Sequence, residues 1–166
     1  LTADMAGIEL SEVDETGETF EENAFLKADS GCKESGMVCV ADDSGLMVDY
    51  LDGAPGVFSA RYAGEECDSE ANMQKLLQNL TGKSNRNAQF RTVIALIING
   101  EEKLFDGVVR GTIATERKGG SGFGYDPVFV PEGYEESFAQ MASELKNAIS
   151  HRSRAASALN DYLQTL

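Results

Sequence analysis

The feature that most limits the fold of this chain is an Asn-Gly pair between two long β-rich runs. The runs cover residues 87–98 and 103–115, and Asn99-Gly100 lies between them. Asn and Gly readily adopt the positive φ angles that a two-residue hairpin turn requires. The pattern therefore predicts one long antiparallel β-hairpin in the second half of the chain.

Helices are predicted before and after the hairpin in the sequence. Thr19 and Glu22 form a capping box at the start of one helix, and Gly36 is a suitable stop for it. A second helix is expected over residues 68–80, where apolar side chains recur on one face. Ser150 is placed to cap a third helix. Its expected inward-facing residues are Ala155, Leu159, Tyr162 and Leu163.

Shorter apolar runs predict further strands at residues 37–41, 45–50 and 128–130. Residues 53–64 are rich in Gly and include a Pro, which is typical of a loop or a short broken helix. Because strands and helices alternate along the chain, we expect an α/β fold with a mixed sheet. The length of 166 residues suits one domain, residues 1–166.

Charge and composition argue against several functional classes. The formal net charge of -14 disfavours binding to the nucleic-acid backbone, which needs basic patches. No run of residues is long and apolar enough to predict a membrane span. The three cysteines, Cys32, Cys39 and Cys67, fit a reducing cytosol better than a disulfide framework or a zinc site.

Two adjacent acids interrupt an otherwise strand-like run, Val38–Val48. Asp42 and Asp43 are followed there by Ser44 and Gly45. Asp and Ser bond readily to their own backbone, so one interpretation is a simple turn. The other is a metal site, because two desolvated carboxylates repel and a bound Mg²⁺ would relieve that repulsion. The local residues leave both interpretations open.

Three further segments carry chemically suggestive residues, each with a simpler alternative. Glu15 precedes an acidic helix start, which the helix dipole by itself explains, but beside the Asp pair it would complete an acidic cluster. Residues 119–127, GGSGFGYDP, would let backbone and aromatic rings approach a planar ligand, or would form a flexible connection. His151 and Arg152 begin a helix, where cations are unfavourable unless a ligand oxygen or solvent compensates them.

Together these segments resemble the inosine triphosphate pyrophosphatase family. The matching stretches are ETGETFEENAFLKA, ADDSGLMVDYLDGAPGVFSARYAG, GGSGFGYDPVFVPEGYEESFAQM and KNAISHRSRA, in family order. The resemblance implies a cytosolic, homodimeric, Mg²⁺-dependent enzyme that hydrolyses ITP, dITP and XTP to the monophosphate and pyrophosphate. It also implies an elongated sheet with flanking helices and two lobes around a nucleotide cleft.

The resemblance further implies roles for individual residues. Glu15, Asp42 and Asp43 would bind the metal, and Asp43 would also be the general base. The expected substrate-binding residues are Lys27, Ser44, Arg61, Phe123, Gly124, Tyr125, Asp126, Lys146, His151 and Arg152. His151 and Arg152 would read the six-position oxygen of the purine, and an arginine side chain, which only donates hydrogen bonds, suits such an acceptor.

The sequence departs from the family pattern in two places. The family begins with a strand and a phosphate-binding loop of the type T/S-x-N-x-x-K, and nothing in this chain matches them, so we expect both to be missing. Leu145 stands where the family tends to have an acid. Two alternatives follow: a weakly active or inactive nucleotide-binding or dimerisation module of the same fold, or a pyrophosphatase or phosphatase for another nucleotide.

Overall fold

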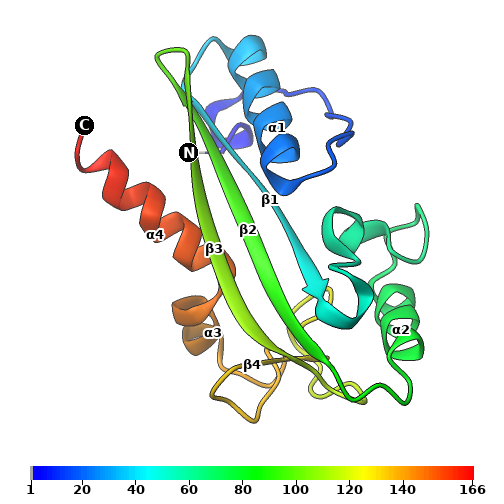
Figure 1. Cartoon of the computed structure of the whole chain (residues 1–166). Helices are drawn as coiled ribbons and strands as arrows, with labels where there is room; N and C mark the ends of the chain where they lie inside the picture. The colour runs from blue at the N-terminus through cyan, green and yellow to red at the C-terminus, as the bar shows by residue number, and fades with distance from the viewer. Residues whose placement is uncertain (1) are drawn as a thin grey trace.

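A computed structural model describes residues 2–166. Figure 1 shows a long twisted sheet with α1 on one side and α4 on the other. The strands are β1 (Cys39–Val48), β2 (Asn87–Ile98), β3 (Glu101–Ile113) and β4 (Phe129–Pro131). The helices are α1 (Phe20–Ser35), α2 (Ser69–Asn79), α3 (Ser143–Ile149) and α4 (His151–Leu163), with short 3-10 helices η1 (Asp4–Ala6), η2 (Asp49–Leu51) and η3 (Gly56–Arg61).

The predicted hairpin is confirmed and forms the centre of the sheet. β2 and β3 pair antiparallel from Asn87 to the turn, where Ile98 pairs with Glu101. Asn99 and Gly100 have φ angles of 53° and 79°, as a two-residue hairpin turn requires. The return strand begins two residues earlier than expected because Glu101 and Glu102 also join the ladder.

The α/β class is confirmed, but the expected mixture of strand directions is corrected. The sheet that the structure describes within residues 2–166 has the order β1-β2-β3-β4, and all of its pairs are antiparallel. β2 and β3 join through a two-residue turn, which forces antiparallel pairing. β1 returns as β2 after η2, η3 and α2, and this connection also reverses the chain direction.

β1 runs without interruption through the acid pair, so the turn interpretation is wrong. Asp42 pairs with Ile94, Asp43 with Val93, and Ser44 with Thr92 in a regular ladder with β2. Successive side chains of a strand point to opposite faces of the sheet. Asp42 and Asp43 therefore lie on different faces.

The helix ends follow the predicted chemistry. The Thr19 hydroxyl accepts a hydrogen bond from the Glu22 N–H at 3.1 Å, and Gly36 ends α1 with a φ of 67°. Ser150 caps α4 by accepting from the Ser153 N–H at 3.1 Å. Ala155 faces the sheet as predicted, but Leu163 is 43% exposed, so its inward assignment is wrong. It lies at the last residue of α4.

Two apolar clusters pack against the sheet. The smaller joins α1 to β2 through Phe20, Ala24, Ala28, Val93 and Ala95. The larger joins α2, the far end of the sheet and the segments after β3. Its buried members include Leu46, Leu76, Leu80, Phe90, Phe129 and Phe138. The two clusters thus pack α1, α2 and the segments after β3 around the sheet strand β1, which carries the acid pair.

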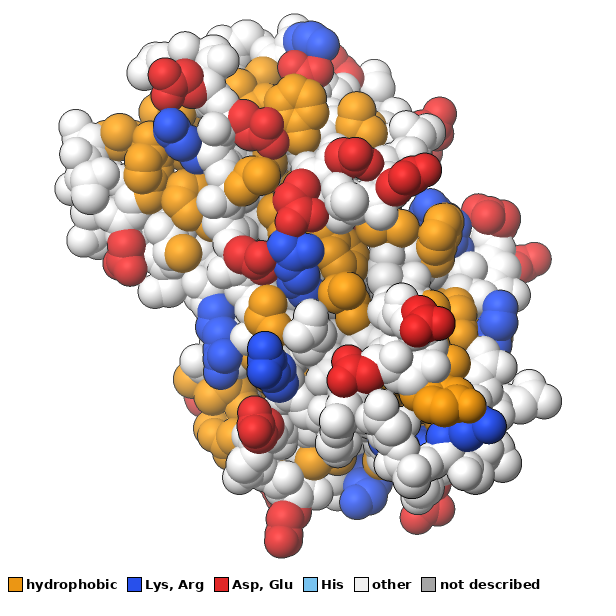
Figure 2. All heavy atoms as spheres, in the orientation of Figure 1, with side chains coloured by type: hydrophobic (Ala, Val, Ile, Leu, Met, Phe, Trp, Pro, Cys, Tyr) orange, Lys and Arg blue, Asp and Glu red, His pale blue; other side chains and the backbone are white. Residues whose placement is uncertain are grey.

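Acidic residues outnumber basic ones by 28 to 14 in this chain. Figure 2 shows acidic side chains spread over the visible face rather than gathered in one patch, which agrees with the net charge of -14. Among residues 2–166, every helix is too short or too polar to span a bilayer.

The close approach of η3 and α1 to β1 depends on Gly45. A Cβ added there would lie 2.7 Å from the Ser59 Oγ and 2.9 Å from the Phe20 ring, and still closer to the Gly56 carbonyl oxygen. We predict that Gly45→Ala lowers the free energy of unfolding by about 1–3 kcal/mol through overpacking. Urea denaturation would measure it. Gly120→Ala is the control, because a Cβ at Gly120 meets no atom within 4 Å. Equal stability of the two variants would contradict the prediction.

Candidate functional site

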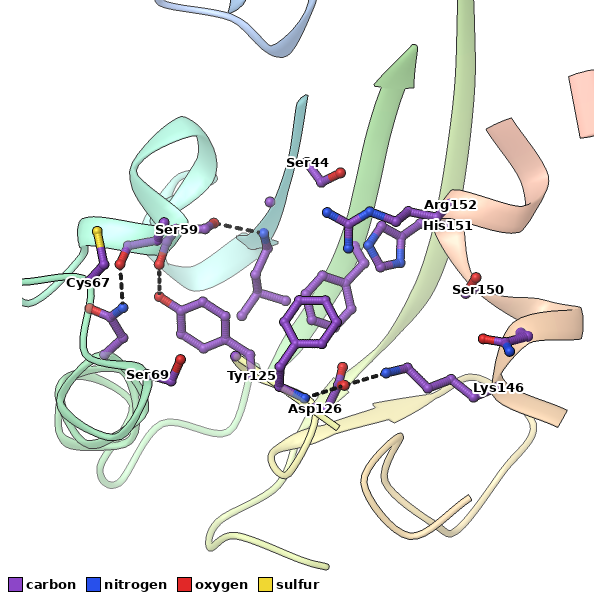
Figure 3. A pocket seen from close by; sticks show the side chains of 18 residues that line it. Ser44, Ser59, Cys67, Ser69, Tyr125, Asp126, Lys146, Ser150, His151 and Arg152 are labelled. Atoms are coloured by element: carbon purple, nitrogen blue, oxygen red, sulfur yellow. Dashed lines mark hydrogen bonds and ion pairs between the residues drawn. The ribbon is translucent and has the colours of Figure 1, made fainter. Parts of the chain in front are cut away.

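A cleft of about 330 Å³ lies where β1 and β2 meet three other parts of the chain. One wall comes from η3 and α2, and the opposite wall from the 123–126 loop, α3 and the start of α4, as the close-up in Figure 3 shows. Its volume falls in the range of small-molecule sites. Eight of the predicted substrate-binding residues line it: Ser44, Phe123, Gly124, Tyr125, Asp126, Lys146, His151 and Arg152.

Tyr125 and Asp126 hold the cleft together rather than project freely into it. The Tyr125 hydroxyl donates to the Ser59 carbonyl at 2.7 Å, which ties the loop to η3. Burial raises the pKa of the Tyr125 phenol, so it stays neutral. The Asp126 carboxylate accepts from the Phe123 N–H at 3.0 Å and forms an ion pair with Lys146. These contacts fix the loop and the first of the two C-terminal helices, α3, relative to each other.

Phe123 lines the cleft, and two cations lie near its ring. Its side chain is 66% exposed. The Lys146 Nζ lies 5.2 Å from the ring centroid, and the Arg152 guanidinium carbon lies 5.6 Å from it. A largely exposed aromatic ring can stack on a planar group of a ligand. That this loop contacts a planar ligand stays a prediction.

His151 is a buried, neutral imidazole in the wall of the cleft. Its ring stacks on Phe90 with centroids 4.8 Å apart and an interplanar angle of 11°. Burial, with the nearby charges of Arg152 and Lys146, lowers the pKa of His151 to about 4. Within residues 2–166 its Nδ1 has no hydrogen-bond partner. A buried polar atom without a partner is uncommon and suits a ligand contact.

The second chemical feature is a group of charges on the opposite face of β1. The Lys27 Nζ lies 2.6 Å from the Glu15 Oε1 and 3.5 Å from the Asp43 Oδ1. The Asn23 side chain donates to the Asp43 Oδ2 at 3.2 Å. Burial raises the pKa of Asp43, and Glu15 adds to the rise, while Lys27 and Asn23 oppose it. A carboxylate of raised pKa beside other charged groups is a candidate proton acceptor.

Asp42 lies apart from this group, on the face shared with Ser44. It accepts from the Ser44 Oγ at 3.1 Å, and its carboxylate lies 3.5 Å from the Arg152 Nε. In the part of the chain that the structure describes, no three Asp, Glu, His or Cys side chains are arranged to hold a metal. The expected convergence of Glu15, Asp42 and Asp43 on one ion is therefore corrected, because strand alternation turns Asp42 away.

Lys27 and Arg61, which are also predicted to contact the substrate, lie outside this cleft. Lys27 sits between the two carboxylates, and the Arg61 Nη2 lies 3.5 Å from the Glu15 carbonyl oxygen. Neither residue lines the 330 Å³ cleft. Both lie beside Glu15, on the side of the acidic group.

Sequence reasoning missed the residues that complete the cleft wall. They are Gly45, Leu46, Ser59, Ala60, Cys67, Ser69, Asn72, Phe90, Asn147 and Ser150. Most carry no local signal, because they line the cleft only through tertiary packing. Asn23 is the other omission. Its position within the capped, acidic start of α1 could have drawn attention to it.

Comparison with known proteins places the chain in a family. Residues 2–162 match the family described as Ham1. The chain belongs to the Ham1 family. It is similar to the dITP/XTP pyrophosphatase of Flavobacterium psychrophilum, with 52% identity over 153 residues, which cover 92% of this chain and 80% of that protein. The protein of the same description from Bacillus subtilis is 48% identical over 156 residues, covering 92% and 79% of the two chains.

Solved structures of this family have the same fold. The Ham1 protein of Staphylococcus aureus superposes with a TM-score of 0.91 at 43% identity, covering 98% of this chain and 84% of that one. A HAM1 protein from Coxiella burnetii gives a TM-score of 0.91 at 41% identity, covering 95% and 82%. These likenesses confirm both the resemblance and the fold class expected from the sequence.

The neutral state of His151 can be tested directly because it is the only histidine. We predict that its Hε1 proton NMR signal titrates with a midpoint near 4 in the folded protein, against an ordinary value of 6.5. In urea the midpoint should return to about 6.5. The unfolded chain then binds the extra proton between these values, so His151 makes stability fall as pH drops through this window, by about 1.4 kcal/mol per unit. A folded-state midpoint near 6.5 would contradict this.

Proposed function

We propose that this protein hydrolyses non-standard purine nucleoside triphosphates (dITP, XTP and ITP) to the monophosphate and pyrophosphate. The observation that carries the proposal is that strand β1 has a ligand-sized cleft on one face and a group of charged side chains on the other. One face contributes Ser44 to a cleft walled by His151 and Arg152, and the other presents Asp43 beside Glu15 and Lys27. The relatives named dITP/XTP pyrophosphatase support the same activity.

The cleft is suited to an oxo purine. Hypoxanthine and xanthine have a hydrogen-bond acceptor at position six, where adenine has a donor. Arg152 offers only donors, and the neutral His151 imidazole offers one donor and one acceptor. In Figure 3, Arg152 and His151 lie side by side at the cleft. Phe123 provides an exposed ring against which the base would stack.

Asp43 is the proposed general base. Water attacks the α-phosphorus, the bond from that phosphorus to the bridging oxygen breaks, and pyrophosphate leaves with the bond electrons. Asp43 accepts the proton of the attacking water, and its raised pKa brings it closer to the operating pH. Lys27 places positive charge beside the same carboxylate, where it would also stabilise phosphoryl oxygens.

We further propose Mg²⁺ as the cofactor, held by Glu15 and Asp43. The donor set fits this ion, because the two carboxylates already share one cation, the Lys27 ammonium. Mg²⁺ prefers one or two carboxylates completed by water and substrate phosphates. When bound, the ion would stabilise the charge that develops on the phosphoryl oxygens. Asp42 is not part of this set.

The proposal also covers the oligomeric state, the location in the cell and the partners of the protein. We propose a homodimer located in the cytosol, where its three free cysteines stay reduced. The net charge of -14 disfavours nucleic acid as a partner. Light scattering after size exclusion tests the assembly, and a mass equal to the monomer's 17.9 kDa would contradict it.

The acid pair offers a matched test of catalysis. We predict that Asp43→Asn lowers kcat for dITP by about 10²–10⁴-fold, because it removes the proton acceptor. Asp42→Asn should cost less than about tenfold, because it weakens a half-exposed ion pair with Arg152 and leaves an amide oxygen that can still accept from the Ser44 hydroxyl. Pyrophosphate release with Mg²⁺ present measures both. No release by the unaltered chain would favour the inactive-module alternative, and equal losses in both variants would contradict the separation of roles.

Base selection is tested at Arg152. We predict that Arg152→Ala lowers the ratio of kcat/KM for ITP to that for ATP by about 10–100-fold, as expected for the loss of a charge-assisted hydrogen bond. Arg154→Ala is the matched control, because Arg154 lies on α4 but bonds to the Val108 carbonyl at 2.8 Å. Its ratio should stay unchanged. If Arg152→Ala reduced hydrolysis of both nucleotides equally, the residue would not select the base.

A further inference from the structure

Asn23 is a buried polar side chain that connects the two acidic segments of the site. It lies in the first turn of α1 and is 0% exposed. Its amide nitrogen donates to the Asp43 Oδ2 at 3.2 Å, and its amide oxygen accepts from the Gly17 N–H at 2.8 Å. One side chain thus spans the gap between β1 and the segment that carries Glu15.

We propose that Asn23 is a positioning residue that fixes the Asp43 carboxylate relative to the Glu15 segment, so that both face one cation. The inference rests on the proposed function, because it assigns the role of Asn23 through that metal-binding pair. Asn23 touches neither substrate nor ion in this proposal. It acts through the two groups that it holds.

The carboxylate orientation follows from the contacts of its two oxygens. Asn23 donates a hydrogen bond to the Oδ2 of Asp43. The Oδ1 faces the Lys27 ammonium, which is 3.5 Å away. The same ammonium contacts the Glu15 Oε1 at 2.6 Å. By binding one oxygen of Asp43, Asn23 directs the other toward the position where the two carboxylates meet a positive charge.

The Glu15 segment needs such an anchor because it has no regular secondary structure. Residues 8–17 form no helix or strand. Gly17 packs so closely on Asn23 that an added Cβ would lie 2.7 Å from the Asn23 Oδ1. An amide supplies a donor at one end and an acceptor at the other. Alanine would leave the buried Asp43 Oδ2 and Gly17 N–H without this partner.

The test measures Mn²⁺ binding to the nucleotide-free protein by electron paramagnetic resonance. We expect Asn23→Ala to weaken Mn²⁺ affinity at least about tenfold, while the ITP-to-ATP selectivity of its residual activity stays unchanged. Asn23→Ser, whose hydroxyl is too short to span both groups, should show the same loss. Loss of cation affinity without loss of base selectivity is not expected from general structural damage.

Asn72 provides the matched control. It is also a buried helical asparagine with two hydrogen bonds, from the Ala63 N–H at 2.6 Å and to the Ala60 carbonyl at 2.7 Å. Asn72→Ala should lose stability to a similar extent in thermal melting but keep its Mn²⁺ affinity. If an Asn23 variant that folds binds Mn²⁺ within about twofold of the unaltered protein, the inference is overturned.

A measurement on the unaltered protein covers the case in which the Asn23 variants do not fold. In a Mg²⁺ titration followed by nitrogen-15 NMR, the Asn23 side-chain amide signal should shift, and that of Asn72 should not. An Asn23 signal that stays in place while Mg²⁺ binds would overturn the inference. If the unaltered protein binds no Mn²⁺ or Mg²⁺ and releases no pyrophosphate, the proposed function itself fails, which is a distinct result.

Discussion

The antiparallel pairing of β1 with β2 is the constraint on which the rest of the site depends. Ten consecutive residues of β1 lie in register with β2, including both acids. This ladder turns the two acids, neighbours in sequence, to opposite faces, where they meet different partners. Asp43 faces α1 with Lys27 and Asn23, whereas Asp42 faces Arg152 at the start of α4. A slip of one residue would exchange these environments, so the register itself specifies the site.

The packing of helices on the two faces then gives each acid its chemical character. On the α1 side, burial and the nearby Glu15 raise the pKa of Asp43, and Lys27 with Asn23 limits that rise. On the other side, the half-exposed Asp42 lies beside the cationic Arg152, which follows the neutral His151 in α4. The proposed reaction needs both environments at once, because base recognition and attack on phosphorus occur at different ends of one nucleotide. Because Asp42 and Asp43 are adjacent residues of β1, one strand contributes an acid to each of the two environments.

The sequence predicted the elements whose signals are local. The Thr19 cap, the Gly36 stop, the Asn99-Gly100 turn and the Ser150 cap each depend on residues within a few positions of one another, and each is present. The errors arose where distant packing decides. Leu163 fits the helical period but lies at the exposed end of α4, and the sheet has only antiparallel pairs among residues 2–166. The expected three-carboxylate site was wrong for a related reason, because adjacency in sequence was taken as adjacency in space.

By itself, the sequence determined the residue types that the chemistry needs and the family to which the chain belongs. The combination of an acid pair, a Gly-aromatic loop and a His-Arg helix start is local information, and it was enough to place eight residues in one cleft. Only the tertiary structure decided how those residues divide between tasks. It separated Asp42 from Asp43, moved Lys27 and Arg61 to the Glu15 side, and brought in Asn23 and Phe90. The physical reason is that side-chain direction and burial are set by strand register and helix packing, which join segments far apart in the chain.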